Sequence, residues 1–165
     1  MKVKSLHELY VTELKDLFHA ENQILKALPD MAEAASATEL RSAFQQHLEQ
    51  TRHHVERLER IFGRLNESPK GRSCEGMEGI IGEGKNMMDI NAPESVKDAA
   101  LIAAAQRVEH YEIAAYGTVR TYARQLGFQE DANLLQETLN EEGETDKKLT
   151  AIAESRVNTE ATRTA

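Results

Sequence analysis

The sequence predicts an all-α protein built from four long helices. Ala, Leu, Glu, Lys, Gln and Arg dominate the 165 residues and only 3 are Pro, a composition that favours helix over sheet. Four long stretches carry apolar residues at the spacing of one helix face. A stretch rich in Gly separates the second from the third, which predicts a long connection in the middle of the chain.

The composition argues against several classes of function. The net charge is −8, and no cluster of Lys and Arg stands apart from acidic neighbours, so we expect no binding to nucleic acid or to a membrane. No apolar run approaches the ~20 residues of a membrane span, and the N-terminal segment has acidic residues where a signal peptide has an apolar core. The single Cys fits a reducing compartment, so we expect a cytoplasmic protein.

The first two helices are expected over residues 5–34 and 38–65. Ser5 is the predicted N-cap of the first helix, with Glu8 as its capping-box partner. Pro29 removes a backbone hydrogen bond inside this helix, so we expect a kink or an early end there. The apolar face of the second helix contains Leu40, Phe44, Leu48, Val55, Leu58 and Phe62.

Residues 64–95 do not continue the helical pattern and form the predicted crossover, in which residues 77–81 and 85–88 are expected to form a short helix. The third helix is predicted over 95–126, ended by Gly127 at the position after the C-cap, and the fourth over 129–155. The polar end of the chain from Ser155 lacks periodicity, so we expect it to be frayed. We therefore expect one domain over residues 1–155 and a flexible tail over 156–165.

The lengths of the connections decide the topology. Short connections join the first helix to the second and the third to the fourth, so each pair forms an antiparallel hairpin. One long crossover, containing a short helix, joins the two hairpins. This order describes a ferritin-like bundle with up-down-down-up topology.

Carboxylates interrupt the apolar faces of three helices. Glu21, Glu112 and Glu142 each lie in the middle of such a face, and Glu109 lies near its edge one turn before Glu112. Counting residues from the two turns at a rise of 1.5 Å per residue places these groups near the middle of the bundle. A buried carboxylate is costly unless it is paired, hydrogen-bonded or bound to a metal, so the four predict a shared site.

The second helix supplies nitrogen ligands at the same level, which include His54 and His47. Gln50 and Thr51 lie beside them, and Glu49 reaches the site only in another register, so the ligand from this helix stays open among these residues. Carboxylate and imidazole ligands suit iron or manganese. We predict a carboxylate-bridged site for two metal ions. Its predicted ligands are Glu21, Gln50, His54, Glu109, Glu112 and Glu142.

Several phrases resemble the YciE/YciF family of ferritin-like bacterial stress proteins. They are AENQILKALP, HLEQTRHHVERLE, CEGMEGIIGEGK, DAALIAAAQRVEHYEIAAYGT and ETLNEEGETDKKLT, and the resemblance covers residues 5–155. It implies a cytoplasmic bundle, often dimeric, with a di-iron centre, no assigned activity, and an association with stress responses, including osmotic stress. It supports Glu21, Glu109, Glu112 and Glu142 as ligands. In the second helix, related rubrerythrins have Glu-x-x-His, whereas Thr51 occupies the Glu position here.

Two hypotheses of function follow. The first is a di-iron, or iron and manganese, oxidoreductase of the ferroxidase or peroxidase kind that reacts with peroxide or dioxygen. The alternative is a non-catalytic structural or interaction protein of the stress response that keeps a relic or metal-storing site.

Overall fold

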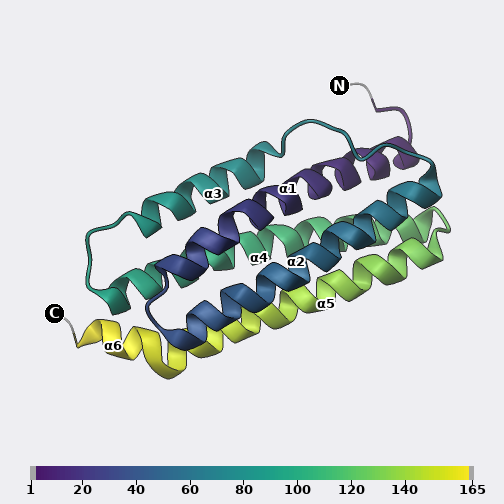
Figure 1. Ribbon diagram of the computed structural model, residues 1–165. Helices are drawn as coiled ribbons and strands as arrows, with labels where there is room; N and C mark the ends of the chain where they lie inside the picture. Colours follow the sequence, from purple (N-terminus) through teal and green to yellow (C-terminus); the bar gives the residue numbers. More distant parts are fainter. Residues whose placement is uncertain (1–2, 164–165) are drawn as a thin grey trace.

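The computed structural model describes residues 3–163, which are helical apart from short connections (Figure 1). The four long helices are α1 (Leu6–Ala34), α2 (Thr38–Leu65), α4 (Glu94–Gln125) and α5 (Gln129–Ile152). The helix α3 (Glu75–Met88) lies in the crossover, and the π-helix η1 (Ala153–Val157) and the helix α6 (Asn158–Thr162) follow α5. The all-α prediction is confirmed, and the short helix in the crossover is one continuous element.

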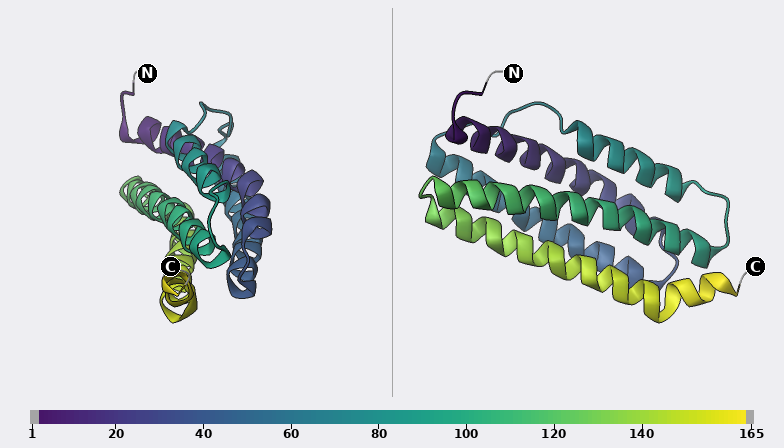
Figure 2. Two further views of the ribbon diagram at one scale, coloured as in Figure 1. Left: turned by 90° about the vertical axis from the view of Figure 1, so that its left-hand side faces the viewer. Right: turned by 180° about the vertical axis from the view of Figure 1, so that it is seen from behind.

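The four long helices form the bundle with the predicted topology. α1 and α5 run in one direction, and α2 and α4 run in the other (Figure 1). α1 packs on α2 and α4, and α5 packs on α4 and α2. Both the front view and the view from behind show α3 alongside α1 and α4, outside the bundle (Figure 2). Within residues 3–163, none of the helices combines the length and the apolar character needed to cross a membrane.

The helix ends show how local sequence sets the boundaries. The Ser5 hydroxyl accepts a hydrogen bond from the Glu8 N–H at 3.1 Å, as predicted for an N-cap, while the Glu8 carboxylate accepts from the Lys4 N–H. Gly127 has φ 80° directly after the C-cap of α4, a conformation that favours glycine.

The start of α2 is held by a residue from another helix. The carboxylate of Asp98 in α4 accepts hydrogen bonds from the N–H groups of Ser36 and Ala37, each at 2.8 Å. The N-cap Ala37 has no side chain that accepts a hydrogen bond. Asp98 is 3% exposed, so it joins the turn between α1 and α2 to the beginning of α4 inside the protein.

The structure bears on two expectations about helix ends, and of the kink or early end expected at Pro29 it excludes the early end. α1 does not end early at Pro29 but continues to Ala34, because Met31 and Ala32 in its last turn are buried and their packing offsets the lost hydrogen bond. The chain from Ser155 is not frayed as expected but helical through Thr162. Ile152 and Val157 are both buried, and their spacing of five residues fits the π-helical turn between them. Residues 164–165 of the predicted tail lie outside the described part.

The hydrophobic core is divided into two clusters. One contains the second half of α1 and the first half of α2, and α3 packs there as well. The other lies at the opposite end of the bundle, around Tyr10, Phe62 and Tyr116. In α2, α4 and α5 the buried polar residues at mid-bundle lie between the buried members of these two clusters in chain order, and in α1 Glu21 directly follows Ala20, the first residue of the second cluster along that helix.

Candidate metal centre

Six side chains with metal-ligating atoms are buried between the four long helices. Each is at most 3% exposed: Glu21 from α1, His47 and His54 from α2, Glu109 and Glu112 from α4, and Glu142 from α5. They are four carboxylates and two imidazoles. This composition equals that of the carboxylate-bridged centres of helical bundles, in which four Glu and two His hold two metal ions.

These side chains form two groups that share one carboxylate. Glu142 belongs to both groups, and in each group the potential ligand atoms lie within 4.8 Å of one another. One group consists of His47, Glu109, Glu112 and Glu142, and the other of Glu21, His54 and Glu142. Glu142 is therefore the carboxylate that could contact a metal ion in either group.

The distances show how closely the two imidazoles approach the carboxylates. His47 Nε2 lies 3.3 Å from Glu109 Oε1 and 3.9 Å from Glu142 Oε2. His54 Nδ1 lies 3.0 Å from Glu142 Oε1 and 3.4 Å from Glu21 Oε1. Each group thus contains one imidazole nitrogen that faces the carboxylates.

Most of the inward-facing atoms have no hydrogen-bond partner. The unpaired buried atoms are Glu21 Oε2, His47 Nε2, His54 Nδ1, Glu109 Oε2, both carboxylate oxygens of Glu112 and both of Glu142. His47 Nε2 and His54 Nδ1 have the ion-pair contacts given above, but these do not have hydrogen-bond geometry. Buried polar groups in proteins are almost always hydrogen-bonded, so a gathering of unsatisfied atoms in one place indicates a shared partner. A pair of divalent cations satisfies them, and the residues present therefore fit a dinuclear metal site.

The pKa shifts reflect the crowding of these charges. Burial, together with the neighbouring Glu142, raises the pKa of Glu109 and of Glu112 well above the usual range. Burial lowers the pKa of His47. Burial also acts to lower the pKa of His54, but the nearby carboxylates outweigh it and raise this pKa to about 12. In the metal-free protein, Glu109, Glu112 and His54 therefore hold protons, which a bound cation would replace.

Comparison with known proteins shows the family to which the chain belongs. Residues 5–162 match the family model DUF892, described as a domain of unknown function. The chain belongs to the DUF892 family. Protein YciF of Escherichia coli (strain K12), a curated relative, is 44% identical over 162 residues, which cover 98% of each chain. The predicted resemblance to YciE/YciF proteins is confirmed.

Solved structures of relatives have the same fold. The crystal structure of the E. coli stress protein YciF has a TM-score of 0.91 at 44% identity, with 94% of this chain and 99% of that chain covered. YcfI from Rhodopseudomonas palustris has a TM-score of 0.88 at 39% identity, covering 92% and 97%. A protein from Xanthomonas campestris pv. campestris, 23% identical, shares the fold with a TM-score of 0.75, covering 96% and 98%.

In this DUF892 chain, the imidazole of His54 also contacts Glu141, which is itself paired with Arg57. Its Nε2 lies 2.8 Å from Oε2 of Glu141. Arg57 donates two hydrogen bonds to the same carboxylate, at 2.6 and 2.8 Å, and one to Thr138. Burial raises the pKa of Glu141, but the contacts with Arg57 and His54 outweigh it and lower this pKa to about 2. The ionised Glu141 therefore accepts a hydrogen bond from the Nε2–H group, which orients the ring so that Nδ1 faces Glu21 and Glu142.

Two further hydrogen bonds involve residues of the buried cluster in this DUF892 chain. The hydroxyl of Tyr116, one turn beyond Glu112 in α4, donates a hydrogen bond to Oε1 of Glu21. The hydroxyl of Thr51 donates to the backbone carbonyl of His47 at 2.8 Å, so Thr51 does not take the ligand position that Glu occupies in rubrerythrin-like patterns.

The structure brings together five of the six predicted ligands. Gln50, the sixth, is half-buried and its side chain interacts with that of His47. His47 faces the carboxylates although it was only one of several alternatives. A signal for it exists in the sequence, because His47 and His54 are seven residues apart and so lie on one helix face. Glu49 is exposed and paired with Arg52, so it is not directed at the site.

Proposed function

We propose that this protein binds two metal ions at the six buried Glu and His side chains and that the loaded site reacts with a peroxide or with dioxygen. The proposal rests above all on one observation: the two groups of potential ligands share Glu142. Support also comes from the eight unpaired buried atoms and from the family, to which the E. coli stress protein YciF belongs. Iron is the metal we propose, with manganese as the alternative, because both accept carboxylate and imidazole ligands.

Each side chain has a role that follows from its position. His47 and His54 are proposed as terminal ligands, one in each group, and Glu142 as the bridge. Glu109 and Glu112 complete the first group, and Glu21 completes the second. All six are buried and lie on helices, so the ligands would need little reorganisation on binding metal ions.

The chemistry that the metal supplies is electron transfer. Two ferrous ions would give one electron each to a peroxide ROOH, where R is hydrogen or carbon, so that its O–O bond breaks and, with two protons, ROH and water form. The two protons come from solvent, because Glu109 and Glu112, whose pKa values are raised in the metal-free protein, would give up their protons on binding the metal ions.

The test is a peroxide titration of protein loaded anaerobically with ferrous iron. We expect one equivalent of hydrogen peroxide to oxidise two ferrous ions per chain, followed by absorption of the ferric product, and we expect a Glu142→Ala variant to bind no stoichiometric iron. Bound iron that does not respond to peroxide would favour the other hypothesis, a non-catalytic stress protein with a relic or metal-storing site.

We also propose that the protein is a cytoplasmic homodimer. The resemblance to YciE/YciF proteins implies both properties, and a single Cys fits a reducing compartment. Light scattering coupled to size-exclusion chromatography tests the assembly, because a dimer has twice the chain mass of 18.5 kDa.

A further inference from the structure

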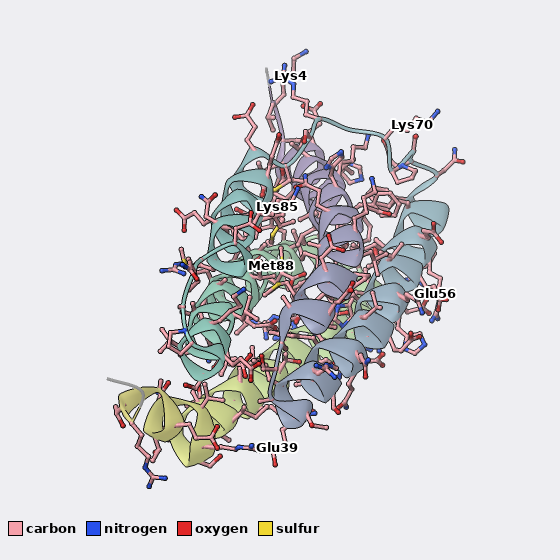
Figure 3. The ribbon with its side chains drawn as sticks, turned by 60° about the vertical axis from the view of Figure 1, so that its left-hand side comes forward. Lys4, Glu39, Glu56, Lys70, Lys85 and Met88 are labelled. Atoms are coloured by element: carbon pink, nitrogen blue, oxygen red, sulfur yellow. The ribbon has the colours of Figure 1, made fainter. Side chains whose placement is uncertain are left out.

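A pocket lies beneath α3, on the side of the bundle that α1 and α4 form. Its volume is about 600 Å³, within the ~300–1,000 Å³ of small-molecule sites. Figure 3 shows Lys85 and Met88 on the side of α3 that is turned toward α1. The walls are largely aliphatic or aromatic, and their larger members are Ile24, Leu28, Met31, Phe44, Ile80, Ile81, Met88, Val108 and Leu149.

The pocket reaches the candidate metal centre. His47 and Glu109 are among the residues that line it, and they are 3% and 1% exposed. His47 Nε2 and Glu109 Oε2 are both unpaired. The same pocket is lined by Lys26 and Lys85, which are exposed. It therefore connects the protein surface with the group that contains His47, Glu109, Glu112 and Glu142.

The charges at the mouth favour a neutral molecule. Lys26 and Lys85 contribute two positive charges, and Asp30 and Glu78 contribute two negative charges. The mouth thus has no net charge that would select an anion or a cation. An apolar body gains from burial against the aliphatic walls, whereas a charged one loses its hydration there.

Small residues create the space. Ala27, Ala104, Gly82 and Gly84 line the pocket, and an added Cβ at Gly84 would lie 3.8 Å from the Cβ of Ala104. Larger aliphatic side chains at such positions would fill part of the volume. The pocket is therefore a consequence of particular residues and can be closed by substitution.

We propose that this pocket binds an uncharged organic hydroperoxide, with its apolar body between α1, α3 and α4 and its hydroperoxy group toward His47 and Glu109. The inference rests on the proposed reaction with peroxides and names the substrate class of that site. The O–O bond is cleaved with the electron and proton balance given above, and the products are the corresponding alcohol and water. Hydrogen peroxide lacks an apolar body and gains nothing from the walls of the pocket.

The first experiment uses metal-free protein and needs no reaction. The probe is 2-phenyl-2-propanol, the alcohol that cumene hydroperoxide yields, and binding is followed by NMR shifts of backbone amides. We expect shifts in α1, α3 and α4 around the pocket. Ala27→Leu should weaken binding about tenfold or more, because its side chain enters the pocket. The matched control is Ala100→Leu, since Ala100 is also half-buried in a helix but does not line the pocket.

The second experiment measures oxidation of the ferrous-loaded protein in a single turnover. Cumene hydroperoxide should oxidise the wild type and the Ala100→Leu variant faster than it oxidises Ala27→Leu, again by about tenfold. Hydrogen peroxide should oxidise all three at similar rates.

The outcomes separate the two proposals. If neither peroxide oxidises the bound iron, the proposed function fails and the substrate class fails with it. If hydrogen peroxide reacts but Ala27→Leu does not slow cumene hydroperoxide, only the inference about the pocket is overturned. It is also overturned if the alcohol causes no localised shifts, or if it binds Ala27→Leu as well as it binds Ala100→Leu.

Discussion

His54 Nε2 lies 2.8 Å from the Glu141 carboxylate, while its Nδ1 lies 3.0 Å from Glu142 on the opposite side of the ring. The two carboxylates are neighbours in sequence but act on different nitrogens. Glu141 is half-buried and paired with Arg57, whereas Glu142 is fully buried among the unpaired oxygens. Glu141 orients the imidazole, and Glu142 would share a metal ion with it in the proposed site.

Removal of Glu141 should weaken metal binding without removing a ligand. In a Glu141→Ala variant, His54 loses the acceptor of its Nε2 proton, and we expect the metal affinity to fall about 10- to 100-fold. Calorimetric titration of the metal-free protein measures it. The matched control is Glu137→Ala, because Glu137 also contacts Arg57, at 3.4 Å, but is largely exposed and has no contact with His54. Equal affinities in the two variants would show that Glu141 has no such role.

Replacement of Glu112 by Leu should stabilise the protein in the absence of metal. Both oxygens of Glu112 are buried and unpaired, and such groups cost on the order of 1–3 kcal/mol. The free energy of unfolding of metal-free Glu112→Leu should rise by about this amount in urea, while metal binding is lost. Glu144→Leu, on the exposed face of α5, should change stability by less than about 0.5 kcal/mol. A destabilised Glu112→Leu protein would contradict the account.

The gain in the free energy of unfolding that Glu112→Leu brings to the metal-free protein should also depend on pH. The raised native pKa of Glu112 means that the folded metal-free protein holds a proton that the unfolded chain releases above its pKa of about 4.3. The stability that comes from this proton is present below the unfolded pKa and is lost as pH rises through the native pKa. The difference in unfolding free energy between the variant and the wild type should therefore grow from about pH 5 to about pH 8. A difference that is constant over this range would show that Glu112 titrates normally.

The sequence allowed much of this site to be predicted, because helical phase alone shows whether a residue faces the core. Glu21, Glu112 and Glu142 lie at the centre of their apolar faces and are fully buried in the structure. His47 could not be assigned in the same way. It lies at the edge of the α2 face, and its contact with Glu109 depends on how α2 and α4 are rotated in the bundle, which no periodicity specifies.

Some features of the fold depend on residues nearby in sequence and could be predicted, whereas others depend on residues that are distant in sequence. Ser5 and Gly127 have their effect through nearby backbone groups, so their roles were readable from the sequence. The start of α2 depends on Asp98, which is distant in sequence. The buried Val157 gives the end of the chain a packing contact that its polar composition did not indicate.

Asp98 provides a test of the fold that is independent of metal. In Asp98→Ala, the N–H groups of Ser36 and Ala37 lose their acceptors, and we expect a loss of about 2 kcal/mol in the free energy of unfolding. Asp98→Asn keeps one acceptor oxygen and should lose less. Chemical denaturation of both variants measures the order. An unchanged stability in Asp98→Ala would mean that water replaces the carboxylate at no cost.

The central claim is that one chain holds two metal ions that share Glu142, and metal analysis of the purified protein tests it most directly. After production with ample iron, mass spectrometry should find two metal ions per chain in the wild type. In Glu21→Ala it should find one, because the group of His47, Glu109, Glu112 and Glu142 remains intact. A wild-type protein that holds no stoichiometric metal under these conditions would contradict the account.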